Sequence, residues 1–106
     1  MAEEMKMRAT LQGDITDVKV RMNHIMETGA RKDPKTGKLI PPHFIDQVVA
    51  TLNGKTVLDA QWGIAISRNP FIGFKVKGAK VGDKIVVNAV DNLGTKFSGE
   101  VAVAAR

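Results

Sequence analysis

A chain of 106 residues is long enough to bury one hydrophobic core, and because it has no cysteine, disulfide bonds, thiolate metal ligands and thiol chemistry are excluded. Its 16 lysines and arginines exceed its 11 aspartates and glutamates, and the net charge of +5 favours acidic partners or anionic small molecules. No apolar run approaches the roughly 18 residues of a membrane-spanning helix, and the first six residues lack the apolar stretch of a secretory signal peptide. We therefore predict a single domain over residues 1–106 with no membrane contact.

Alternation of apolar and polar residues, which is typical of half-buried strands, runs through most of the chain, and no segment shows a convincing helical period. In chain order, the predicted strands cover residues 5–11, 18–22, 44–52, 57–62, 72–76, 85–89 and 97–103. The strongest turn signal between them is Asn53-Gly54, since a type I′ hairpin turn needs positive φ at both central positions. Trp62 is expected in the core. About seven short strands with regular turn signals predict an all-β, antiparallel sandwich.

The longest interruption of the strand pattern, residues 24–43, is typical of a functional loop, because connections usually have only about four to six residues. It holds both histidines and four basic residues, Arg31, Lys32, Lys35 and Lys38. Pro34 and Gly37 predict a tight turn within it, since proline presets φ and glycine permits positive φ. The loop is either an exposed, soluble tip or an electrostatic docking surface for an acidic partner or an anionic cargo.

His24 and His43 flank this loop, and a sandwich fold could bring them together. Glu27 and Asp33 could then add oxygen ligands. Two imidazoles alone make a poor metal site, because zinc takes four protein ligands, or three and a water. We therefore predict no metal site and expect each histidine to hydrogen-bond to the loop backbone.

No catalytic residues are predicted. A serine-histidine-aspartate triad would need Ser67 or Ser98 and an acid such as Asp91, but the chain has no Gly-x-Ser-x-Gly elbow. It also lacks the glycine-rich loops that bind nucleotide phosphates, so no cofactor is predicted. The segment 67–70 is typical of a turn, in which Pro70 should push Asn69 to an extended conformation.

Nucleic-acid binding is not predicted either. Lysines at positions 75, 77, 80 and 84 could line one edge of the protein. Binding of single strands usually pairs such charge with exposed aromatic side chains on which bases stack. The nearby aromatics are Phe71 and Phe74, and Phe74 shares its strand face with Ile72 and Val76, so it is expected in the core.

Several segments together resemble one protein family. They are His24-x-Met26-Glu27-Thr28-Gly29-x-Arg31-Lys32-Asp33, Gly37-Lys38-x-Ile40-Pro41, Phe44-Ile45, Asn53-Gly54-Lys55, Ser67-x-Asn69-Pro70-Phe71, Gly82-Asp83 and Asp91-Asn92-x-Gly94. On these motifs, which extend over nearly all of the chain, it resembles the Z subunits of the SoxYZ thiosulfate-oxidation carrier complex. Ile25 stands where many relatives have proline, and Phe71 where tyrosine is common.

The resemblance implies an immunoglobulin-like β-sandwich that is not an enzyme and binds no cofactor. It implies a heterodimer with a SoxY-like subunit, which carries sulfur intermediates covalently on a cysteine near the end of a flexible C-terminal tail. It also implies transient contacts with the Sox enzymes that act on that tail. The family is periplasmic, and export with the partner, on the partner's signal, would explain the leaderless N-terminus that we expect here.

The segment His24-x-Met26-Glu27 is also similar to the iron loop of superoxide reductases, another immunoglobulin-like fold. That iron needs four histidines and a cysteine. This chain has two histidines and no cysteine, so the ligand count excludes such an iron centre.

The predicted partner interface should include apolar side chains without a core role, and Met26, Ile40, Phe71 and Ile72 are the candidates. The polar candidates are Glu27, Arg31, Lys32 and Asn69. The alternative to a carrier subunit is a stand-alone basic β-sandwich module that binds an anionic polymer or metabolite.

Overall fold

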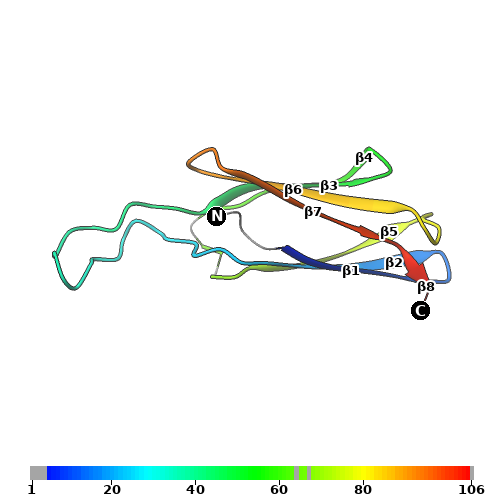
Figure 1. Cartoon of the computed structure of the whole chain (residues 1–106), viewed down its shortest axis with the longest axis horizontal. Helices are drawn as coiled ribbons and strands as arrows, with labels where there is room; N and C mark the ends of the chain where they lie inside the picture. Colours follow the sequence, from blue (N-terminus) through cyan, green and yellow to red (C-terminus); the bar gives the residue numbers. More distant parts are fainter. Residues whose placement is uncertain (1–4, 64, 67, 106) are drawn as a thin grey trace.

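Two four-stranded β-sheets, packed face to face, form the body of the molecule (Figure 1). The structure is a computed structural model that describes residues 5–63, 65–66 and 68–105. Its strands are β1 (Met5–Gln12), β2 (Ile15–Met22), β3 (Ile45–Leu52), β4 (Lys55–Gln61), β5 (Phe71–Lys77), β6 (Lys84–Asp91), β7 (Lys96–Ala102) and β8 (Ala104–Ala105). No helix in this described part of the chain is long and apolar enough to cross a membrane.

One sheet has the strand order β5-β2-β1-β8, and the other has the order β4-β3-β6-β7. Neighbouring strands are antiparallel, apart from a short parallel contact between β8 and β1. The prediction of an immunoglobulin-like antiparallel sandwich is confirmed. The seven predicted strands are all present. Their ends shift by at most three residues, since β2 begins at Ile15 and not at Val18, and the short β8 was not predicted.

The hydrophobic core lies between the two sheets, as the period of two along each strand requires. Inward-facing side chains of three strands, β2, β3 and β6, are almost completely buried. They include Val18, Val20, Met22, Ile45, Val48, Ala50, Ile85 and Val87. Trp62, predicted as a core residue, is half-buried and packs against this cluster, and Phe74 does the same from β5.

Two asparagines with positive φ shape the connections between strands. Asn53 and Gly54 have φ of 49° and 87°, so the predicted tight turn between β3 and β4 is confirmed. Asn69 has a φ of 52°, and the prediction that Pro70 pushes it to an extended conformation is therefore wrong. Two hydrogen bonds to His24 hold it there: the Asn69 amide donates to the His24 carbonyl (2.8 Å), and Asn69 Oδ1 accepts from the His24 amide (3.1 Å).

Candidate functional site: a projecting basic loop and its anchor

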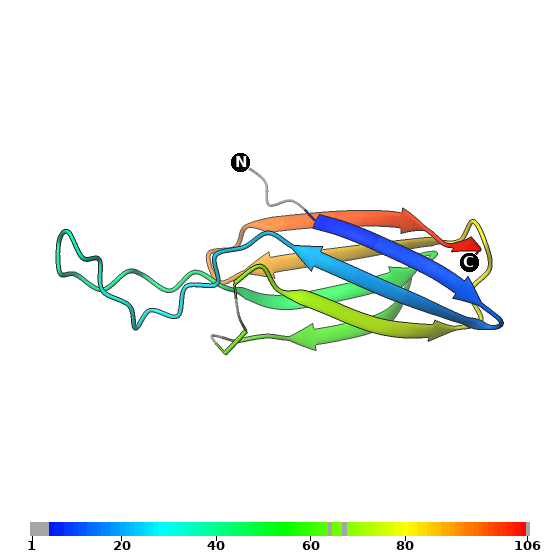
Figure 2. The ribbon, with the colours of Figure 1, turned by 90° about the horizontal axis from the view of Figure 1, so that it is seen from below.

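Residues 23–44, which connect β2 to β3, extend far beyond the end of both sheets (Figures 1 and 2). We call this segment the projecting loop. It contributes to a molecule that is 54 Å long but only 23 Å and 22 Å across. It is the long loop predicted from the sequence, and it stands away from the hydrophobic core for most of its length.

Main-chain hydrogen bonds tie the two legs of the projecting loop together. Glu27 and His43 bond to each other in both directions, at 2.7 and 3.0 Å, near the base. Further out, the Ile40 amide donates to the Arg31 carbonyl at 2.8 Å, and Lys32 and Leu39 form an isolated bridge. The loop is thus a narrow antiparallel ribbon whose two legs are held together by backbone hydrogen bonds.

A tight turn closes the tip of the projecting loop. The Gly37 amide donates to the Asp33 carbonyl at 2.7 Å, and Asp33 Oδ1 accepts from the Lys35 amide at 2.8 Å. Gly37 has a φ of 72°, so its predicted role in the turn is confirmed. Lys32, Lys35 and Lys38 are exposed around this turn, which places their charge at the far end of the molecule.

The base of the projecting loop depends on close packing. Gly29 has a φ of 87°, and a Cβ atom there would lie 3.2 Å from Cβ and Cδ of Pro42 on the opposite leg. Met26 is buried in the core cluster, and its sulfur accepts from the Ile45 amide at 3.3 Å. The Glu27 carboxylate is paired with the Arg31 guanidinium, and this hydrogen bond lowers the pKa of Glu27 below its ordinary value although burial opposes the shift.

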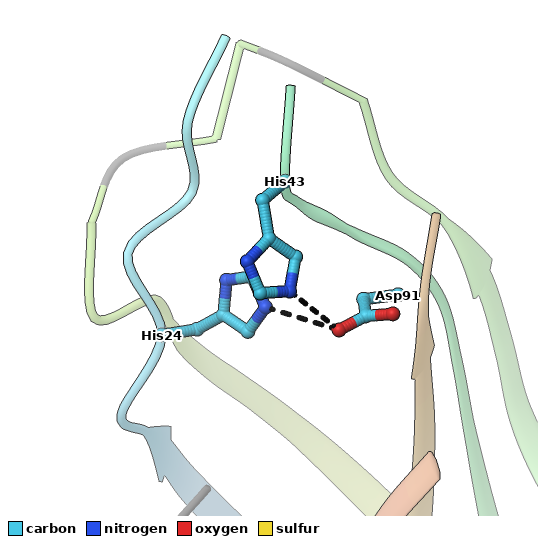
Figure 3. A group of neighbouring side chains, drawn as sticks. All are labelled: His24, His43 and Asp91. Atoms are coloured by element: carbon cyan, nitrogen blue, oxygen red, sulfur yellow. Dashed lines mark hydrogen bonds and ion pairs between the residues drawn. The ribbon is translucent and has the colours of Figure 1, made fainter. Parts of the chain in front are cut away.

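His24 and His43 meet at the point where the projecting loop joins the sandwich, which the sequence left as a possibility (Figure 3). Their rings are 4.7 Å apart, edge to face. Both point at the carboxylate of Asp91, the last residue of β6: His43 Nε2 lies 2.8 Å from Asp91 Oδ2, and His24 Nε2 lies 3.6 Å from the same oxygen. The backbone amides of Leu93 and Thr95 donate to the other oxygen, at 3.0 and 2.9 Å.

The acid beside the histidines is not one of those suggested as a source of oxygen ligands. Glu27 pairs with Arg31, and Asp33 shapes the tip, so neither contributes an oxygen to the histidines. The expected bonding of both histidines to backbone holds for His24, whose Nδ1 accepts from the Met26 amide at 3.0 Å. For His43 the ring partner is the Asp91 side chain.

The nitrogen and oxygen atoms of His24, His43 and Asp91 lie within 4.8 Å of one another, which is close enough to test for a metal site. The bond from the Met26 amide makes His24 Nδ1 an acceptor, so the neutral ring carries its proton on Nε2, which faces Asp91. A metal on Nε2 would force that proton to Nδ1, against an N–H donor. The hydrogen bonding therefore opposes a metal and fits an anchor that clamps the loop to the end of β6.

The hydrogen bonds around Asp91 decide its charge. Burial raises the pKa of this carboxyl group, but the bonds from His43 and from the amides of Thr95 and Leu93 outweigh burial and hold the pKa below its ordinary value. Asp91 is therefore ionised at neutral pH, and the anchor is an ionic hydrogen-bonded cluster that is almost completely buried on the aspartate side.

This depressed pKa predicts a loss of stability in acid. Ionised Asp91 favours the folded state above the aspartate pKa of the unfolded chain, about 3.9, and this contribution disappears as the pH falls through the lower folded-state value. We expect the unfolding free energies of the wild type and Asp91→Asn to differ clearly at pH 6 and to approach each other near pH 3, as measured by urea denaturation. An equal difference at both pH values would contradict this assignment.

The structure separates the predicted interface residues into three groups. Met26 and Glu27 are buried at the base of the loop and offer almost no surface. Arg31 and Lys32 are exposed along the loop, and Ile40 is half-buried opposite them. Exposed Asn69 and Phe71 lie in and after the connection to β5, whereas Ile72 packs against the core from β5. The role of these residues in an interface stays a prediction.

The described residues do not assemble the serine triad considered above. Ser98 lies opposite Asn88 on the outer face of the β6–β7 pair, whereas the histidines lie at the base of the projecting loop. Ser67, the other serine considered, is outside the described residues.

The fold and the site define an immunoglobulin-like β-sandwich that carries a projecting basic loop. Two solved structures share this fold. A hypothetical protein, PH1083 from Pyrococcus horikoshii OT3, is 16% identical with a TM-score of 0.64. A superoxide reductase in the oxidized state is 15% identical with a TM-score of 0.62. Each comparison covers 98% of this chain and 90% of the other, and at such identities the likeness shows the fold alone.

Comparison with the curated proteins gave no match. The model of the family described as "Sulphur oxidation protein SoxZ" matches residues 5–102, and the chain belongs to this family. Membership gives the protein a role in the Sox system of sulfur oxidation, and with it a partner within that system.

Proposed function

We propose that this protein is the non-catalytic subunit of a SoxYZ-type sulfur carrier. It pairs with a SoxY-like subunit, whose C-terminal cysteine tail carries sulfur intermediates during thiosulfate oxidation. The carrier works in the periplasm, where both subunits arrive by joint export, and the Sox enzymes bind it transiently. The match of nearly the whole chain to the SoxZ family is the observation that carries this proposal.

Two features of the chain support a binding role over a catalytic one. A protein without cysteine cannot itself hold a sulfur intermediate as a thiol adduct, so the reactive thiol has to come from another subunit. The projecting loop also presents exposed side chains, among them Arg31, Lys32 and Leu39, which is 60% exposed. Apolar and basic groups raised on a narrow ribbon suit contact with another protein.

The proposal predicts a stoichiometric partner. Tagged protein, isolated from the periplasm of cells grown on thiosulfate, should co-purify with one subunit that ends in a glycine-rich, cysteine-containing tail, identified by mass spectrometry. The same protein isolated alone should not turn over thiosulfate or another sulfur compound. A periplasmic fraction that yields the chain without such a subunit, or turnover by the chain alone, would overturn the proposal.

A stand-alone basic module remains the second candidate because of the net charge of +5. It requires the chain to be isolated without a partner subunit and to bind an anionic polymer or metabolite with defined stoichiometry. The same purification distinguishes the two functions.

A further inference from the structure

The outer face of strands β5, β2 and β1, which is turned to the viewer in Figure 2, concentrates the positive charge of the molecule. Its outward side chains include six cations, Lys6, Arg8, Lys19, Arg21, Lys75 and Lys77. Asp17 is the one acidic residue on this face within the described strands. With six cations and one carboxylate, this face has a net charge of +5, which equals the net charge of the whole chain. The charges of the other ten cations and ten acids of the sequence cancel one another.

Four of these cations form a square, because Lys6 lies directly opposite Arg21 and Arg8 directly opposite Lys19. Side chains directly opposite on a sheet have Cβ atoms about 5 Å apart, at which like charges repel and destabilise the pair. Within the described residues, none of the four takes part in an ion pair. This cationic square therefore costs the fold stability, which points to a use outside the monomer.

The surroundings of the cationic square suit a contact with another protein. A shallow groove lined by all four cations ends at Phe71, which lies opposite Arg21 on β5 and is 57% exposed. The ring of Phe71 lies against Gly73, where a Cβ atom would come within 3.6 Å of the ring. Arginine and aromatic side chains are the residue types that most often anchor protein interfaces.

The outer face of the other sheet shows that this charge is not a general property of the strands. Val49 lies opposite Asn88 there, and Thr51 lies opposite Val86. These central pairs carry no charge. Cores of permanent interfaces are depleted of charged residues, so these uncharged central pairs are better suited to a permanent partner than the cationic square is.

We propose that the cationic square is a docking surface for an acidic protein that binds transiently. If the proposed function holds, that protein is an enzyme acting on the carrier. The groove is shallow and open, so it fits a protein surface better than a small anion, which is usually enclosed in a concave pocket. One aromatic side chain on this face does not supply the successive stacking surfaces that single-stranded nucleic acid uses. Binding through such charge is fast and sensitive to salt.

The test uses tagged full-length chain, purified with any subunit that accompanies it, and a fluorescent peptide of ten glutamates as the probe. In one variant the cationic square is neutralised by Lys6→Gln, Arg8→Gln, Lys19→Gln and Arg21→Gln. The matched control removes the same charge outside this face and outside the projecting loop, by Lys55→Gln, Lys80→Gln, Lys84→Gln and Lys96→Gln, all of which alter exposed lysines. We expect at least about a tenfold loss of affinity at low salt for the first variant and less than about threefold for the control.

Each other outcome counts against the proposal. Equal losses in the two variants would mean that only net charge matters. Absence of peptide binding by the unaltered protein would mean that the face is covered or inactive. Tighter binding of a ten-nucleotide thymidine strand, with the same dependence on the four cations, would assign the face to nucleic acid. Because the peptide assay needs no sulfur substrate and no particular subunit, its failure is distinguishable from failure of the proposed function.

Discussion

Replacing Asp91 with alanine is expected to lower the free energy of unfolding by about 3 kcal/mol or more, a large share of the stability of a small domain. The substitution removes the acceptor of two backbone amides, those of Leu93 and Thr95, and the carboxylate that both histidine rings approach. Asp91 and His24 are almost completely buried, so water replaces the lost partner of the His24 ring poorly. The projecting loop should loosen at its base in the same variant.

Urea denaturation at pH 7 measures this effect. Glu100→Ala is the matched control, because Glu100 also forms an ion pair, with Lys84 at 3.4 Å, but both of those side chains are more than half exposed. An exposed pair of this kind contributes only about 0–1 kcal/mol. A loss for Asp91→Ala as small as that for Glu100→Ala would show that the cluster is not an anchor.

Substitution of Gly29 by alanine should open the projecting loop without unfolding the sandwich. Alanine at a φ of 87° carries a conformational cost of about 1–2 kcal/mol, and its Cβ would also press on the ring of Pro42 at 3.2 Å. Because the loop stands apart from the core, the opening should be local. Amide hydrogen exchange measures it: the amide of His43, bonded to Glu27, should lose about tenfold or more of its protection.

The substitution Gly37→Ala separates the conformational cost of alanine at positive φ from the effect of the contact with Pro42. Gly37 has a similar φ of 72°, but no atom lies within 4 Å of the position of its Cβ, so only the conformational cost applies. Exchange should speed up at the tip, where the Asp33 amide donates to the Lys38 carbonyl, and less at His43. Equal effects of the two substitutions at His43 would mean that the contact with Pro42 does not hold the base together.

Local physical chemistry made most of the fold predictable. The alternation of apolar and polar residues identified seven strands and the sandwich, because a strand with one buried face must repeat every two residues. The dipeptide Asn53-Gly54 predicted the turn between β3 and β4, since few other residue pairs tolerate positive φ at both positions. The length of the segment between β2 and β3 likewise indicated the projecting loop, and the positions of its flanking histidines allowed the contact that the structure shows.

The partner of those histidines was decided only by tertiary packing. The sequence alone does not show which of the acids Glu27, Asp33 and Asp91 contacts the histidines. Asp91, at the end of β6, is 48 residues from His43 along the chain. The conformation of Asn69 was likewise decided by tertiary packing. Its two hydrogen bonds to His24, 45 residues away, override the local effect of Pro70. A contact between distant segments can oppose a local preference. Sequence neighbours alone therefore predict neither the contact of Asp91 with the histidines nor the positive φ of Asn69.

Strand pairing also created the cationic square. The sequence shows alternating basic residues on two segments, an arrangement that is also typical of ordinary solvated strand faces. Only the register of β1 against β2 sets Lys6 opposite Arg21 and Arg8 opposite Lys19, and only the addition of β5 beside β2 brings Phe71 to them. Residue type and period are properties of the chain itself, whereas a concentration of like charge depends on distances across strands, which exist only once the sheet has formed.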